Sequence, residues 1–98
     1  MNADERRLYL DQITEGVIGC VHRVSNTLGV GFVEKVYENA LVIELRDAGF
    51  EVVQQHRMEV RYKDSIVGDF VADLLVENAV IVEVKAVKAL DEVHAAQA

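Results

Sequence analysis

The sequence contains no proline, no tryptophan and a single cysteine, Cys20. A lone cysteine excludes an internal disulfide and is typical of a reducing compartment, so we predict a cytoplasmic protein. No run of residues is long and apolar enough to span a membrane, and residues 1–10 lack the apolar segment of a secretory signal. The sequence therefore predicts neither a disulfide-stapled secreted domain nor a membrane protein.

Basic residues are also scarce, with 10 Lys and Arg against 17 Asp and Glu and a formal net charge of −7. This charge disfavours a protein that coats nucleic acid through a basic surface. It leaves room for a site where a metal ion supplies the positive charge. An acidic surface that only keeps the protein in solution explains most of the excess.

A chain of 98 residues, 51% of them hydrophobic, has room for one small domain. We predict that this domain covers residues 11–98 and that the polar residues 1–10 form a flexible N-terminus. Because a core of this size gives modest stability, association with a second subunit would help.

Apolar spacing predicts two helices in the first half of the domain. Over residues 11–28, apolar side chains recur at three- and four-residue steps, which is the pattern of one buried helix face. The glycine-containing residues 29–31 end this helix, and a second helix covers about residues 32–48, with Gly49 as its stop. The apolar stripe of the second helix is Val33, Val36, Tyr37, Ala40, Leu41, Leu45 and Ala48.

Two charged features of this half leave alternatives open. Glu34 points almost the same way as Leu41, so it is either half-exposed at a favourable helix start or aimed at a site. In a first strand, predicted over residues 51–63 with a bend near Gln54–His56, the odd-numbered face carries three cations. These cations suit either phosphate groups or a solvated sheet edge.

Two further strands are predicted over residues 66–76 and 80–87, with apolar side chains on both faces. Opposed residues of an antiparallel pair share a face. If residues 77–79 form a three-residue loop, Asp73 therefore faces Glu83. A two-residue loop would put these two carboxylates on opposite faces.

Asp73, Glu83 and Lys85 are charged residues inside these apolar strands. Burying charges costs several kcal/mol unless they are paired or bind something. Two carboxylates are ligands that Mg²⁺ or Mn²⁺ prefers, and a nearby lysine can assist a nucleophilic water. A buried ion pair is the structural alternative, and spacing alone does not decide between the two.

The run Gly31-Phe-Val-Glu34-Lys-Val-Tyr37 fits the pattern G-x-x-E-x-x-Y. In this run, and in FVADLLVE and VIVEVKAVKALDEVHAAQ, the chain resembles the GxxExxY protein family over about residues 10–98. That family is placed with the PD-(D/E)xK nuclease-like superfamily. The resemblance implies an α+β, restriction-endonuclease-like core: two N-terminal helices, a three-stranded antiparallel sheet and a C-terminal helix. Here that helix is truncated, and the family's final strand is absent.

The resemblance also implies roles for individual residues. Asp73 is the motif aspartate, and Glu83 and Lys85 form the E-x-K pair. Glu34 is a further acidic ligand, and the Val84 backbone oxygen joins Asp73 and Glu83 as a metal ligand. Two supporting residues complete the set, namely Tyr37, beside Glu34, and Gln97, on the helix after E-x-K.

The function implied is that of a Mg²⁺- or Mn²⁺-dependent nuclease, which hydrolyses phosphodiester bonds of nucleic acid, DNA foremost, by metal-activated water. An absent final strand would leave an exposed sheet edge and favour a homo-oligomer. The alternative is a non-catalytic module that uses the nuclease fold for dimerisation or partner binding.

Overall fold

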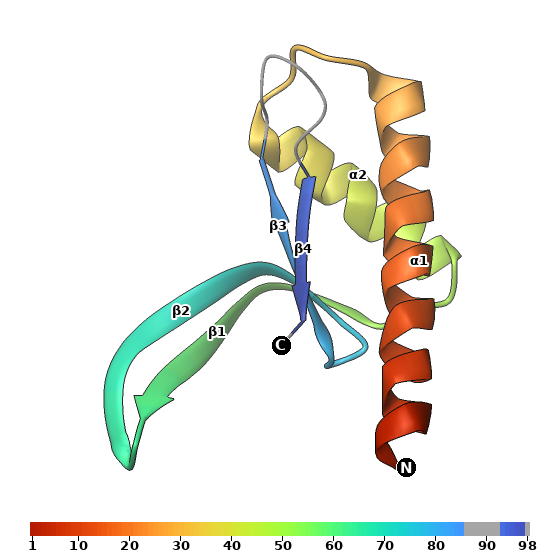
Figure 1. Ribbon diagram of the computed structural model, residues 1–98. Coiled ribbons are helices and arrows are strands. Elements are labelled where there is room, and N and C mark those ends of the chain that lie inside the picture. The colour runs from red at the N-terminus through yellow and green to blue at the C-terminus, as the bar shows by residue number, and fades with distance from the viewer. Residues whose placement is uncertain (86–92, 98) are drawn as a thin grey trace.

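The computed structural model describes residues 1–85 and 93–97. Two helices are followed by an antiparallel sheet with the strand order β1-β2-β3-β4 (Figure 1). The elements are α1 (Ala3–Leu28), α2 (Glu34–Asp47), β1 (Val52–Tyr62), β2 (Ser65–Val76), β3 (Val80–Val84) and β4 (Val93–Gln97). The predicted α+β class, with helices first and a sheet of β1, β2 and β3 after them, is confirmed and is consistent with a restriction-endonuclease-like fold.

The core lies between the two helices and one face of the sheet. In the sheet it uses alternate residues, because successive side chains of a strand point to opposite faces. Its buried members are Ile13, Val17, Cys20, Val24, Tyr37, Leu41, Val42, Leu45, Val52, Leu74, Val76, Val80, Val82 and Val84. The lone cysteine is therefore a packed core residue. No helix in the described part of the chain is long and apolar enough to cross a membrane.

Helix α1 begins at Ala3, whereas the apolar spacing predicted a helix from about residue 11. Asn2 is the N-cap, and its side chain accepts a hydrogen bond from the Glu5 N–H at 2.9 Å. Asp4 and Glu5 lie in the first turn, where the helix dipole favours negative charge. Capping and charge thus extend the helix beyond its apolar stripe.

Helix α2 buries a different face at its start from the one that the apolar stripe predicted. Val33 is the N-cap, outside the helix, and is 69% exposed. The buried residues are Tyr37, Glu38, Leu41, Val42 and Leu45. The two flanking stops are as expected, because Gly31 and Gly49 have φ of 108° and 92°.

The β1–β2 hairpin is long, and its outer part, residues 57–71, projects away from the helices (Figure 1). We call residues 57–71 the arm. Gln55 has a positive φ of 55° within the predicted bend, and the register of the two strands shifts further out, at Val60/Arg61. The large hydrophobic side chains exposed on the arm are Val60, Tyr62, Ile66, Val67, Phe70 and Val71.

The connection between β2 and β3 is the three-residue loop 77–79, because Val76 pairs with Val80 and Leu74 with Val82. This is the loop length that a shared face for Asp73 and Glu83 requires. Strand β3 ends at Val84. The rest of its predicted range, residues 86 and 87, lies outside the described residues.

Residues 93–97 form strand β4, so the predicted C-terminal helix is wrong for these residues. Strand β4 pairs antiparallel with β3, with Val84 opposite Val93 and Val80 opposite Gln97. The outer edge of β3 presents backbone donors and acceptors that a neighbouring strand satisfies, and this pairing overrides local helix propensity. The open edge that we predicted beside β3 is therefore occupied.

Candidate functional site

Asp73 and Glu83 come together where β2 diverges from β3. The backbone pairing of the two strands runs as far as Leu74 and Val82, and one step further the same register sets Asp73 opposite Glu83. There the Val84 N–H donates a hydrogen bond of 2.9 Å to Asp73 Oδ2. A side-chain carboxylate thus replaces a backbone acceptor at the point where the sheet opens.

Glu83 is partly buried, and its hydrogen-bonding capacity is less well satisfied than that of Asp73. Its Oε1 is buried and has no hydrogen-bond partner among the described residues. Burial raises the pKa of Glu83 above its ordinary value, and Asp73 raises it further, because protonated Glu83 can donate a hydrogen bond to Asp73 and because the negative charge of Asp73 disfavours a second one. The charge of Lys85 acts in the opposite direction. The site thus holds an excess of negative charge that a proton or a cation would neutralise.

Lys85 follows directly after β3 and is exposed. The structure brings it close enough to Glu83 to affect the pKa of that carboxyl group. In the described part of the chain there are four ion pairs, and Lys85 belongs to none of them. The buried ion pair considered as an alternative is therefore absent from the described residues.

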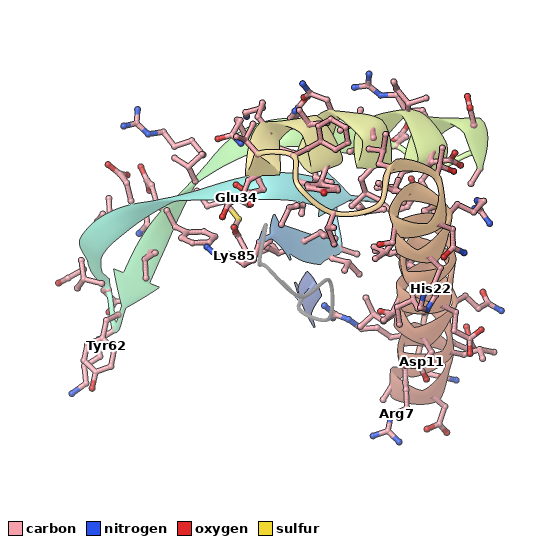
Figure 2. The ribbon with its side chains drawn as sticks, turned by 90° about the horizontal axis from the view of Figure 1, so that it is seen from above. Arg7, Asp11, His22, Glu34, Tyr62 and Lys85 are labelled. Carbon is pink, nitrogen blue, oxygen red and sulfur yellow. The ribbon has the colours of Figure 1, made fainter. Side chains whose placement is uncertain are left out.

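Glu34 lies in the first turn of α2 and is exposed. The start of α2 and the end of β3 are neighbours in Figure 1, and Glu34 and Lys85 lie on the same side of the molecule in Figure 2. Within residues 1–85 and 93–97, however, no third histidine, cysteine, aspartate or glutamate completes a metal-binding group with Asp73 and Glu83. Glu34 is thus near this end of the sheet but separate from the pair.

The buried acid of α2 is Glu38, which sequence reasoning missed. Its side chain accepts hydrogen bonds from Lys35 Nζ at 3.0 Å, Gln54 Nε2 at 2.6 Å and Gln55 Nε2 at 3.0 Å. Burial by itself raises the pKa of Glu38, but these hydrogen bonds outweigh burial and the net shift is downward. Its three-residue spacing from Leu41, on the apolar stripe, was the signal available in the sequence.

Gln55 links this buried acid to the pair, because its Nε2 also lies 3.5 Å from Asp73 Oδ1. Side chains from α2, β1 and β2 and the backbone of β3 are thereby joined in one polar network. Asp73 receives a hydrogen bond on each of its oxygens, from Gln55 and from the Val84 N–H. Asp73 is accordingly the better satisfied of the two paired carboxylates.

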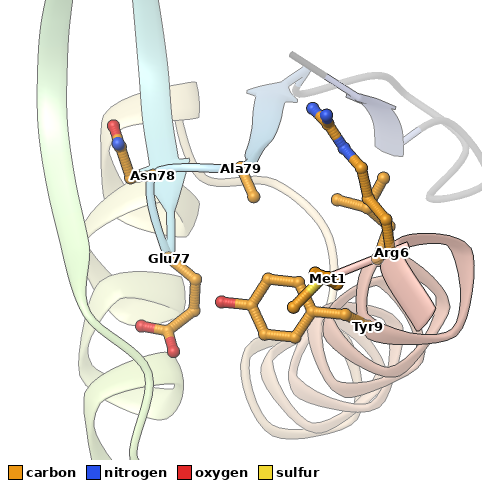
Figure 3. Close-up of a pocket in the computed structure, with 7 residues that line it drawn as sticks. Met1, Arg6, Tyr9, Glu77, Asn78 and Ala79 are labelled. Carbon is orange, nitrogen blue, oxygen red and sulfur yellow. The ribbon is translucent and has the colours of Figure 1, made fainter. Parts of the chain in front are cut away.

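A surface hollow of about 340 Å³ lies elsewhere, between the start of α1 and the β2–β3 loop (Figure 3). Glu77 and Tyr9 point toward one another across it. Its lining residues are Met1, Arg6, Tyr9, Leu10, Glu77, Asn78 and Ala79. Since this loop joins the opposite end of β3 from Glu83, the hollow is not part of the carboxylate site.

The family model of the PD-(D/E)XK nuclease superfamily matches residues 11–98. The chain belongs to the PD-(D/E)XK nuclease superfamily. No curated protein and no solved structure gives a match. Asp73 and Glu83-Val84-Lys85, which the family resemblance predicted as the motif residues, lie near one another at the opening of the sheet. A nuclease type of function follows from the family.

Tyr37 holds the loop that precedes α2 in this PD-(D/E)XK protein. Its hydroxyl donates to the Gly29 carbonyl at 2.7 Å and accepts from the Phe32 N–H at 3.3 Å. The Phe32 ring packs edge-on against the tyrosine ring, with centroids 6.2 Å apart. Together with the positive φ of Gly31, this clamp sets where α2 begins and so where Glu34 lies.

The remaining predicted site residues lie on β3 and β4. A strand residue directs its N–H and carbonyl to the same side, so the Val84 carbonyl faces β2 as its N–H does. The backbone of Gln97 lies opposite Val80, at the far end of β3 from Glu83. The side chain of Gln97 is outside the described part of the structure.

Proposed function

We propose that this protein is a divalent-metal-dependent nuclease that hydrolyses phosphodiester bonds of nucleic acid. Its cofactor is Mg²⁺ or Mn²⁺, and its main substrate is DNA. The observation that carries the proposal is the Asp73–Glu83 pair, with a buried Glu83 oxygen that has no protein partner among the described residues. Within the superfamily we propose the GxxExxY branch, on the grounds of Gly31, Glu34 and Tyr37.

The donor set suits a hard divalent cation. Mg²⁺ keeps several waters and uses one or two carboxylates, so Asp73 and Glu83 are a sufficient protein contribution. The Val84 carbonyl is a third candidate oxygen. Two neighbouring negatively charged carboxylates favour binding of a cation. For the same reason they favour binding of a proton, and the pKa of Glu83 is raised.

When bound, such a cation supplies Lewis-acid polarisation of the scissile phosphate. The residues of the chain do the rest. Asp73, fixed by hydrogen bonds on both oxygens, orients the site, and Glu83 supplies the second charge. We assign to Lys85 the task of orienting the attacking water and stabilising the negative charge that develops on the phosphate. Glu34, on the same side, would contribute a further ligand or a hydrogen-bond acceptor.

The test is a cleavage assay on double-stranded DNA, single-stranded DNA and RNA with Mg²⁺, run beside Mn²⁺ binding by titration calorimetry. We expect Glu83→Ala to abolish both cleavage and Mn²⁺ binding. Lys85→Met should bind Mn²⁺ but not cleave. The matched control is Asp11→Asn, which removes an exposed acid of α1. The proposal is overturned if the wild type binds no Mn²⁺ at millimolar concentration, or if Asp11→Asn impairs cleavage as much as Glu83→Ala.

The arm favours a second function, a non-catalytic module that dimerises. Its exposed apolar residues, defined above, belong to a hairpin that projects from the body, and contiguous exposed apolar surface marks interaction sites. Sedimentation across a dilution series tests this. We expect the wild type to shift from dimer to monomer on dilution and Val67→Lys to be monomeric throughout. A wild type that is monomeric at all concentrations argues against this function.

A further inference from the structure

We propose that Gln55 is a positioning residue for Asp73, and that it holds this carboxylate in the orientation that the metal site needs by tying it to the buried Glu38. The expected effect of Gln55 on metal affinity rests on the proposed metal-dependent function. The contact between Gln55 and Asp73 rests on the geometry of the structure alone. Gln55 lies on β1, outside the Asp73 and Glu83-Val84-Lys85 motif that defines the site.

The amide nitrogen of Gln55 lies between two carboxylates. Its Nε2 is 3.1 Å and 3.0 Å from the two Glu38 oxygens and 3.5 Å from Asp73 Oδ1. Ionised carboxylates only accept hydrogen bonds, and a side-chain amide nitrogen carries two hydrogens. One hydrogen therefore serves Glu38 and the other serves Asp73, which also determines which way the amide is turned.

Glu38 is a suitable anchor because it is itself fixed. It is 4% exposed and also accepts hydrogen bonds from Lys35 and Gln54. A carboxylate with this many donors has little freedom to move. Through Gln55, Asp73 is thus connected to the helix layer and not only to the neighbouring strand.

The backbone of β1 is bent in the way that this bridge requires. In a regular strand Gln54 and Gln55 would point to opposite faces, yet both reach Glu38. The φ of Gln55 is 55°, although the register is unbroken on either side of it, from Gln54↔Leu74 to His56↔Ala72. A left-handed residue other than glycine persists where its surroundings over-determine it, and such residues cluster at functional sites.

The carboxylate of Asp73 is therefore held through both of its oxygens. Gln55 binds Asp73 Oδ1 and the Val84 N–H binds Oδ2, so the plane of the carboxylate is set by two donors from different strands. Donors that orient a metal ligand typically change metal affinity about 10- to 100-fold when removed. Gln55 is expected to act through Asp73 and not to contact the cation.

The chain offers a matched control in Gln54, which donates to Glu38 and Asn39 but makes no hydrogen bond with Asp73 within the described structure. We would measure Mn²⁺ affinity by titration calorimetry for the wild type, Gln55→Leu, Gln55→Gly and Gln54→Leu. Gln55→Gly removes the amide while relieving the left-handed backbone, so it guards against a variant that simply fails to fold. We expect both Gln55 variants to bind Mn²⁺ about 10- to 100-fold more weakly. Gln54→Leu should weaken binding less than either, because Glu38 keeps its donors Lys35 and Gln55 and the contact with Asp73 remains.

A second readout needs no metal, namely the hydrogen-exchange rate of the Val84 amide compared with that of Val82 on the same strand. If Gln55 orients Asp73, the Gln55 variants speed exchange at Val84 but not at Val82, and Gln54→Leu has a smaller effect at Val84 than either Gln55 variant. Unchanged relative exchange at Val84, or equal Mn²⁺ loss in Gln54→Leu, overturns the inference. A selective effect at Val84 with no Mn²⁺ binding by the wild type would instead overturn the proposed nuclease function.

Discussion

Replacing Glu83 with glutamine should stabilise the metal-free protein while destroying its metal site. Glu83 Oε1 is buried without a hydrogen-bond partner among the described residues and lies beside Asp73. A buried polar atom left without a partner costs about 1–3 kcal/mol. The amide of Glu83→Gln removes the negative charge and offers hydrogens that Asp73 can accept. We therefore expect the free energy of unfolding at pH 7.5 to rise by about 1–3 kcal/mol.

The sign of this change in the free energy of unfolding can be checked through its dependence on pH. Because the pKa of Glu83 is raised in the folded state, the folded protein holds this proton more tightly than the unfolded chain does. The stability that protonated Glu83 contributes is complete below its ordinary pKa of 4.5 and is lost as the pH rises through the raised value. The advantage of Glu83→Gln over the wild type should accordingly grow with pH over that window.

The assay is thermal unfolding by circular dichroism, in chelator, from pH 4.5 to pH 8. For a domain of this size, each kcal/mol corresponds to about 4–8 °C in Tm. The control is Asp64→Asn, which removes an exposed acid of the β1–β2 turn and should leave Tm nearly unchanged. A Tm of Glu83→Gln equal to or below that of the wild type at pH 7.5 would refute the reasoning.

Three further predictions concern the loop before α2 and the pH dependence of binding. Tyr37→Phe should lower the free energy of unfolding by about 1–3 kcal/mol, because the Gly29 carbonyl loses its donor; urea denaturation measures this, and an unchanged midpoint contradicts the clamp. Gly31→Ala should cost about 1–2 kcal/mol at its φ of 108°, whereas Gly68→Ala, which meets open space at an ordinary φ, should have little effect. Mn²⁺ affinity should rise with pH through the raised pKa of Glu83 and then level off, because the cation competes with a proton there; a flat calorimetric profile from pH 5 to pH 8 contradicts this.

The pairing of Asp73 with Glu83 was predictable because strands have a strict two-residue period. With a three-residue loop between the strands, Asp73 and Glu83 must share a face, and the structure has this loop. The order of helices and strands was predictable for a similar reason, since apolar spacing and the glycine stops are local signals.

Other features depended on tertiary contacts that spacing does not contain. The burial of Glu38 depends on hydrogen-bond donors from β1, which the helix spacing does not place beside it. Residues 93–97 have helix-forming alanines, but the edge of β3 draws them into a strand. The polar cap at Asn2 was too short a signal to extend α1 to Ala3. A bend near Gln54–His56 was predicted, but the left-handed backbone of Gln55 and the link to Asp73 were not.

Asp73 takes the place of a backbone acceptor where β2 leaves β3, so the carboxylate site lies at the base of the arm. Strand β2 continues from Asp73 directly into the arm. We therefore expect a macromolecule that binds the arm and displaces it to displace Asp73 as well. Binding at the arm would in this way change the distance between the two carboxylates.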